Sequence, residues 1–223
     1  MQPIFNIPRL LSKLIFLLIA MHLVKYMLIG GMIALDGWLG QQLLTLFDGF
    51  LLVPSRVLSP DFDHFFSIYT SLLTHGLLHV DLMHLIANIG FLLAFGVPLF
   101  HRLKPFGWFL LLMLSIIGGG FAYVFFTSNP DIPAVGISGG VSGLMGAILR
   151  PSLIHSRYLP IEQPFKRRSN AAVMLMVFIA FNLLSAISIQ GTSVLGLIAW
   201  QAHFGGFITG FMLYPAIWRS QWK

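Results

Sequence analysis

The sequence contains no cysteine, which excludes disulfide bonds, thiolate metal ligands and a cysteine nucleophile. Charge is scarce as well, because Asp, Glu, Lys and Arg make up only 9% of the 223 residues, against roughly 25% in a soluble domain. Apolar residues account for 57% of the chain, and the mean hydropathy is +0.86. These proportions exclude soluble enzyme classes, the α/β-hydrolases among them, and indicate an integral membrane protein. The first apolar run is too long for a cleavable signal peptide and has no convincing cleavage site.

What the chain has instead is six apolar runs, which predict membrane helices because a spanning helix needs about 20 residues. The runs cover approximately residues 10–34, 82–100, 106–126, 138–149, 171–189 and 194–218. We therefore expect an all-α, polytopic bundle of six transmembrane helices, folded as one domain over residues 1–223. The limits of the first run are open because Lys25 lies inside it.

A long connection, over about residues 36–78, follows the first run. Its pieces 37–47 and 64–73 are amphipathic, which predicts that the connection lies in the outer membrane interface. Contact with a substrate and a purely structural cover are both open interpretations of this segment.

Basic residues are distributed unequally between the two sides of such a bundle. One side holds eleven of the thirteen: Arg9, Lys13, Arg102, Lys104, Arg150, Arg157, Lys166, Arg167, Arg168, Arg219 and Lys223. The other side holds Arg56 and most of the acidic residues. Because basic loops are retained in the cytoplasm, both termini are expected to be cytoplasmic. The formal charge of +6 therefore reflects membrane topology, and we expect no nucleic-acid partner.

Residues 135–147, VGISGGVSGLMGA, place Ser138 among small residues at the start of the short fourth run. The twelve residues 138–149 would reach about 18 Å as a helix, whereas the hydrocarbon core is about 30 Å thick. If Arg150 holds the lower end near the cytoplasmic headgroups, the helix begins well below the outer surface. Irregular backbone at that depth is tolerated only around a wet cavity or inside protein. We therefore expect Ser138 on the floor of a polar pocket that opens to the outer side.

The same glycines also have a plainer interpretation, since small residues often form helix-packing faces in membrane proteins. Gly136 and Gly139 flank Ser138, and more glycines follow along one helix face. In the sixth run, Gly206 follows His203 and belongs to a similarly smooth face. Close approach of the two backbones would bring the His203 imidazole within hydrogen-bond reach of the Ser138 hydroxyl.

Three histidines and an asparagine mark the start of the second run: His75, His79, His84 and Asn88. Donation to a backbone carbonyl is the simpler interpretation of His75 and His79. Metal binding is less favoured, because only Asp81 is near enough to complete a site and it fits better as a helix cap. We therefore expect no metal and no cofactor. His84 and Asn88 lie one helical turn apart, and polar groups in a membrane helix usually have a function.

Acidic residues are absent from the interiors of the predicted helices, so no carboxylate is placed to orient His203. A serine needs a base to become a useful nucleophile, and a full triad needs an acid behind that base. The residues therefore indicate a dyad of Ser138 and His203. The backbone N–H of Ser138 and the side chains of His84 and Asn88 are the candidate donors to an oxyanion.

With these residues the chain resembles the rhomboid family of intramembrane serine proteases, most clearly over residues 74–214. The pattern H-x3-H-x4-H-x3-N is matched by His75, His79, His84 and Asn88. The pattern G-x-S-G-x3-G-x2-G is matched by Gly136, Ser138, Gly139, Gly143 and Gly146. The pattern A-H-x-G-G-x3-G is matched by Ala202, His203, Gly205, Gly206 and Gly210.

The resemblance implies that Ser138 and His203 form the catalytic dyad and that His84 and Asn88 help to form the oxyanion hole. Supporting roles in the site are expected for His75, His79, Gly136, Gly139 and Gly206. The implied substrates are membrane-anchored proteins, cut in or near their transmembrane segments. The chain resembles the compact six-span bacterial form, which implies the plasma membrane and a site open to its outer side. One departure is that Thr70 and Ser71 stand where many rhomboids carry a Trp-Arg pair.

We therefore expect an intramembrane serine endopeptidase whose partners are transmembrane protein substrates and the lipid bilayer. The alternative is a rhomboid-like protein that binds transmembrane helices without cutting, and such a protein could dispense with Ser138 or His203. A transporter or channel would favour intramembrane carboxylates or inverted repeats, and the sequence has neither. The oligomeric state is not indicated by the sequence.

Overall fold

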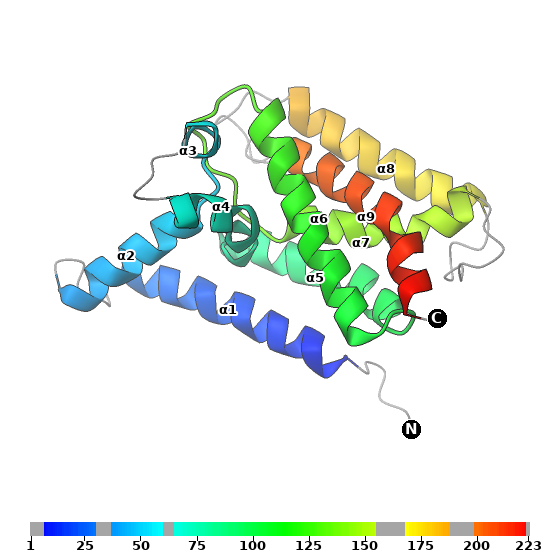
Figure 1. The fold of residues 1–223 in the computed structure, drawn as a ribbon, viewed down its shortest axis with the longest axis horizontal. Helices are drawn as coiled ribbons and strands as arrows, with labels where there is room; N and C mark the ends of the chain where they lie inside the picture. The colour runs from blue at the N-terminus through cyan, green and yellow to red at the C-terminus, as the bar shows by residue number, and fades with distance from the viewer. Residues whose placement is uncertain (1–6, 30–36, 60–64, 155–167, 188–198, 222–223) are drawn as a thin grey trace.

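The fold is all-α, as predicted (Figure 1). The structure, a computed structural model, describes residues 7–29, 37–59, 65–154, 168–187 and 199–221. Its helices in these ranges are α1 (Arg9–Ile29), α2 (Trp38–Phe50), α3 (Pro54–Leu58), α4 (Phe65–Thr74), the short 3-10 helix η2 (His75–Leu77), α5 (Leu82–Phe100), α6 (Pro105–Phe126), α7 (Ser138–Leu153), α8 (Arg168–Ile187) and α9 (Trp200–Ser220).

Each predicted apolar run overlaps one helix: α1, α5, α6, α7, α8 and α9 in chain order. The second run matches α5, and Asp81 is the cap that the sequence predicted, since its carboxylate accepts from the His84 backbone N–H at 2.8 Å. The parts of the predicted runs at 30–34, 188–189 and 194–198 lie outside the described residues.

The fourth run was predicted too short at its C-terminal end. Helix α7 continues through Arg150 to Leu153. Arg150 does not end the helix, because its guanidinium donates to the Phe211 carbonyl at 3.1 Å and lies 5.0 Å from the centre of the Phe211 ring. At 16 residues α7 still reaches only about 24 Å, less than the hydrocarbon core of about 30 Å.

Among the described residues, four helices are long and apolar enough to cross a membrane: α1, α5, α6 and α8. The other two helices of the predicted bundle are exceptional for different reasons. Helix α7 is short, and α9 has 21 residues but carries polar groups that include Gln201 and His203. Helix α7 lies inside the bundle, where α6 and α9 pack against it and nearly all of its side chains are buried. Helix α9 is only partly covered, since Ile208 and Met212 are exposed.

Glycine makes the contact between α7 and α9 close. A Cβ atom on Gly206 would lie 1.9 Å from the Gly139 carbonyl oxygen, and one on Gly210 would lie 2.0 Å from the Gly143 carbonyl oxygen. Helix α6 joins the same contact, since a Cβ on Gly119 would lie 2.6 Å from the Ala202 carbonyl oxygen. The predicted backbone contact between the fourth and sixth runs is therefore confirmed.

The connection between α1 and α5 supports the chain that leads into α7. Leu52 and Ala134 exchange backbone hydrogen bonds of 2.9 and 3.4 Å, and the Ser55 N–H donates to the Pro130 carbonyl at 2.9 Å. Thr70 and Ser71, which replace the Trp-Arg pair, lie within helix α4, and Ser71 is buried. These contacts give the connection a structural role in holding the loop before Ser138.

Candidate active site

Ser138 is the first residue of α7, and the turn before it depends on a glycine. Gly136 has φ +118°, a conformation that side-chain-bearing residues rarely adopt. Its N–H donates to the His75 carbonyl at 2.9 Å, which joins the turn to η2. The Ser138 N–H therefore lies in the first turn of a helix, where backbone N–H groups have no acceptor within the helix.

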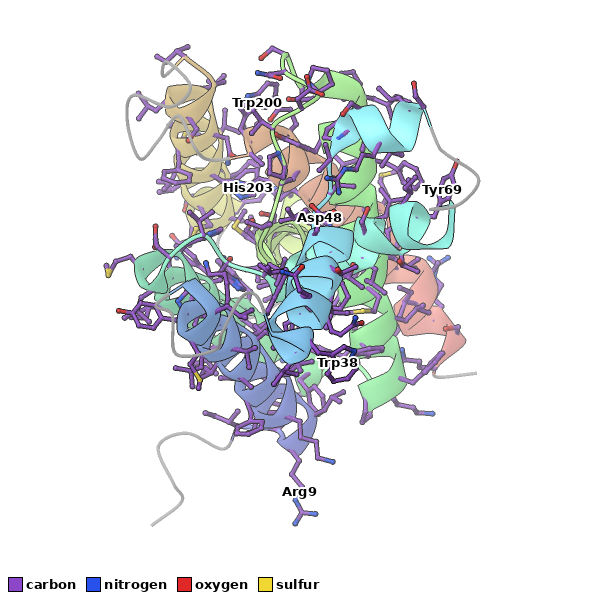
Figure 2. All side chains as sticks on the ribbon, turned by 90° about the vertical axis from the view of Figure 1, so that its left-hand side faces the viewer. Arg9, Trp38, Asp48, Tyr69, Trp200 and His203 are labelled. Atoms are coloured by element: carbon purple, nitrogen blue, oxygen red, sulfur yellow. The ribbon has the colours of Figure 1, made fainter. Side chains whose placement is uncertain are left out.

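The structure brings His203 of α9 to the Ser138 hydroxyl. The distance between His203 Nε2 and Ser138 Oγ is 2.9 Å, within hydrogen-bond range, and both side chains are partly exposed. In Figure 2 the view runs nearly along α7, and His203 lies beside the end of this helix. The predicted pair is therefore assembled across the glycine contact between α7 and α9.

A third side chain, which the sequence analysis did not identify, contacts the imidazole from α8. Asn182 Oδ1 lies 2.9 Å from His203 Nδ1, and Asn182 Nδ2 donates to the Phe178 carbonyl at 2.8 Å. Asn182 is fully buried. The imidazole therefore has a polar contact from a third helix that the sequence analysis did not predict. A signal was available, because Asn182 is a polar residue within an apolar run.

His84 and Asn88 of α5 lie on the other side of the turn before Ser138. A Cβ on Gly136 would lie 2.9 Å from His84 Cε1 and 3.6 Å from Asn88 Nδ2, so only glycine leaves room for both. Asn88 is buried, and its Nδ2 has no hydrogen-bond acceptor among the described residues. An unpaired amide donor beside the turn before Ser138 fits the predicted oxyanion role.

His75 behaves as the simpler interpretation predicted. It is buried, and its Nδ1 lies 2.8 Å from the Ser71 carbonyl oxygen, to which it donates. Burial disfavours the charged ring and lowers the pKa of His75 to about 4. His75 is therefore a neutral structural residue that positions the Gly136 turn through its own carbonyl.

The His79 ring lies near the Leu77 backbone but does not make a well-aligned hydrogen bond like that of His75. The ring is buried and neither ring nitrogen has a hydrogen-bond partner among the described residues. It packs edge-on against the His84 ring, with centroids 5.2 Å apart. Burial, reinforced by the nearby His84, lowers the pKa of His79 to about 3. The backbone carbonyls of His79 and Val80 accept from Lys25 Nζ, which explains the lysine within the first apolar run.

Metal binding by these histidines was the less favoured interpretation of their spacing in the sequence. Within the described ranges, no group of three or more His, Asp or Glu side chains is arranged to hold a metal ion. His79 and His84 instead pack against each other, and His75 faces Ser71. The arrangement places the Ser138 hydroxyl next to the His203 imidazole. The N–H donors of His84 and Asn88 lie on the other side of the turn at Gly136.

A family model described as Rhomboid domain matches residues 67–220 of this chain. Among curated relatives, RHOMBOID-like protein 6, mitochondrial, from Arabidopsis thaliana is 30% identical over 145 residues, covering 64% of this chain and 41% of the relative. RHOMBOID-like protein 4 from the same plant is 32% identical over 146 residues, covering 64% of this chain and 32% of the relative. The match therefore spans less than half the length of these curated relatives.

Proposed function

The chain belongs to the rhomboid family, and from this premise and the site geometry we propose that it is an intramembrane serine endopeptidase. The single observation that carries the proposal is the 2.9 Å contact between Ser138 Oγ and His203 Nε2. A serine hydroxyl is a weak nucleophile until a base accepts its proton, and an imidazole in hydrogen-bond range is such a base.

In the first half of the reaction, Ser138 Oγ attacks the carbonyl carbon of the scissile peptide bond while its proton passes to His203 Nε2. The carbonyl oxygen becomes an oxyanion, which accepts hydrogen bonds from the Ser138 N–H and from Asn88 and His84. The dipole of α7 favours negative charge at this position. The tetrahedral intermediate collapses when His203 returns the proton to the leaving amine, and an acyl-enzyme remains on Ser138.

In the second half, water attacks the ester carbon and His203 accepts a proton from that water. When the second tetrahedral intermediate collapses, His203 returns the proton to Ser138 Oγ, and the acid product leaves. Ser138, His203 and His84 are partly exposed, which supports access of water to the ester. Asn88 is buried and remains a fixed donor through both halves.

The proposed substrates are transmembrane proteins of the same lipid bilayer, cut in or near their membrane segments. In the proposed orientation, both termini are cytoplasmic, the site opens to the outer side, and the membrane is a bacterial plasma membrane. The described basic residues at helix ends support this orientation, including Arg9, Arg102, Arg150 and Arg219.

The test is cleavage of a single-span reporter protein by the purified chain in liposomes, combined with labelling by a fluorophosphonate serine probe. Ser138→Ala and His203→Ala should each abolish cleavage and labelling while the protein still folds and accumulates. Ser142→Ala is the matched control, because this serine is on the same helix, one turn further on, and lies buried in the bundle.

Cleavage by the Ser138→Ala protein would contradict the proposal. Loss of labelling only in the Ser142→Ala protein would show that Ser142, and not Ser138, is the reactive serine. A wild-type chain that binds the reporter without cutting it or reacting with the probe would be a helix-binding protein instead.

A further inference from the structure

We propose that Asn182 is a positioning residue that selects the tautomer of His203 able to accept the Ser138 proton. The inference deepens the proposed function, on which it rests. It makes the reacting unit a Ser–His–Asn series across three helices, α7, α9 and α8, in place of a dyad.

The first step is the orientation of the Asn182 amide. A carbonyl oxygen only accepts hydrogen bonds, so the amide atom 2.8 Å from the Phe178 carbonyl must be the NH2 group. The amide oxygen then has to be the atom that lies 2.9 Å from His203 Nδ1. The local helix thus fixes which end of the amide meets the imidazole.

The second step is the proton on the imidazole. An amide oxygen only accepts, so His203 Nδ1 carries the hydrogen of the neutral ring and donates it to Asn182. In that tautomer Nε2 has a free lone pair, and Nε2 is the atom 2.9 Å from Ser138 Oγ. The Ser138 hydroxyl therefore donates to Nε2, which is the direction that proton transfer requires.

The third step is the position of Asn182 in α8. Many apolar side chains of this helix are exposed, among them Val177, Phe181 and Leu184. Asn182, in contrast, is fully buried. One turn before it, Phe178 stacks on Phe207 of α9 with ring centroids 5.0 Å apart, which holds this part of α8 against the helix of His203. A buried amide in an apolar helix is costly unless its hydrogen bonds are made. Asn182 makes two such bonds, and one of them is to His203.

Ser185 shows what a polar residue on the same helix does without this role. It is also buried, and its hydroxyl donates to the carbonyl of Phe181, four residues earlier in α8. Asn182 makes the equivalent bond within its helix and a second bond to another helix. Ser185→Ala is therefore the matched control, since it removes a buried polar group from α8 and leaves His203 untouched.

The experiment compares Asn182→Leu, Asn182→Asp and Ser185→Ala with the wild-type chain in liposomes. Leucine has a similar size and cannot accept the imidazole hydrogen, so kcat should fall roughly tenfold or more with little change in KM, as for loss of a buried hydrogen bond. Aspartate accepts the same hydrogen, so it should restore much of kcat. Its charge favours the imidazolium, and the acid limb of the pH–rate profile should move to higher pH. His84, the other titratable group that acts on His203, is unchanged in every variant.

A readout independent of turnover is ¹⁵N NMR of histidine-labelled protein, with the His203 signals assigned by loss in His203→Ala. The wild type should show a protonated Nδ1 and a bare Nε2, and Asn182→Leu should show both tautomers. Unchanged tautomers and an unchanged kcat in Asn182→Leu, or equal losses in Asn182→Leu and Ser185→Ala, would overturn the inference. If the wild type shows the predicted tautomer but does not cleave or react with the probe, the proposed function fails and the positioning contact stands.

Discussion

At the scale of single residues, the position of a serine within α7 decides which groups its hydroxyl can contact. Ser138 and Ser142 have nearly the same sequence surroundings, but only Ser138 lies in the first turn of α7 and contacts an imidazole. Ser142, one turn later, is buried among helices. The first turn also supplies free backbone N–H groups, so in the proposed mechanism the nucleophile and one oxyanion donor come from the same residue.

Asn88→Ala should lower kcat with little change in KM, because an oxyanion donor acts mainly on the transition state. Loss of one such donor costs roughly 10²–10³ in rate in other proteases, and the lower end is expected here because His84 and the Ser138 N–H remain. Steady-state kinetics on the liposome reporter would measure this. An unchanged kcat would reduce Asn88 to a packing residue.

The buried His75 predicts a pH dependence of stability. Its pKa is lowered from 6.5 to about 4, so between these values the unfolded chain binds a proton that the folded protein does not bind. The free energy of unfolding should therefore fall as the pH drops from 6.5 towards 4, by on the order of 3 kcal/mol from His75. Unfolding in detergent micelles at a series of pH values measures the slope.

His75→Gln is the control for that slope. Glutamine keeps an N–H donor for the Ser71 carbonyl but has no titrating ring, so this variant should lose less stability over the same pH range. Some slope should remain, because the pKa of His79 is lowered as well. Identical slopes in the two proteins would mean that His75 does not contribute.

At the scale of helices, the site exists because α7 and α9 touch through their backbones. The Gly206 contact with Gly139 lies one residue from Ser138 on α7 and three residues from His203 on α9. A side chain at this crossing has no free space, because the nearest atoms belong to backbone that cannot rotate away.

Gly206→Ala should therefore separate the two helices and abolish both cleavage and serine-probe labelling, even where the protein still accumulates in the membrane. Gly90→Ala is the control, since a Cβ there meets nothing within 4 Å. Gly96 would be a poor control, because a Cβ there would lie 3.2 Å from the Trp108 ring. Wild-type activity in Gly206→Ala would contradict the close backbone contact between α7 and α9 at this position.

At the scale of the whole molecule, the ends of the helices separate into two groups. The start of α1 and the ends of α7 and α9 lie towards the right of Figure 1, whereas α2, α3 and α4 lie on the left. The right-hand group carries Arg9, Arg150 and Arg219, which agrees with a cytoplasmic assignment for that side.

The absence of cysteine makes this orientation directly testable by single substitutions. Ser220→Cys, at the exposed end of α9, should react with a membrane-impermeant maleimide only after the cells are permeabilised. Ser128→Cys, exposed in the loop between α6 and α7, should react in intact cells. The reverse pattern would invert the topology and place the site opening towards the cytoplasm.

The sequence by itself determined the class of protein, the long apolar helices and the cap at Asp81. It also determined the pairing of Ser138 with His203 and the glycine contact between the fourth and sixth runs. These follow from composition, apolar length and small-residue spacing, which are properties of segments read one at a time. It did not determine that Asn182 meets His203, that Lys25 binds the carbonyls before α5, or that His79 packs edge-on against His84. Each of these depends on which faces of distant helices are turned towards each other. Only the tertiary structure decides that, because packing of the entire bundle sets the rotation of every helix.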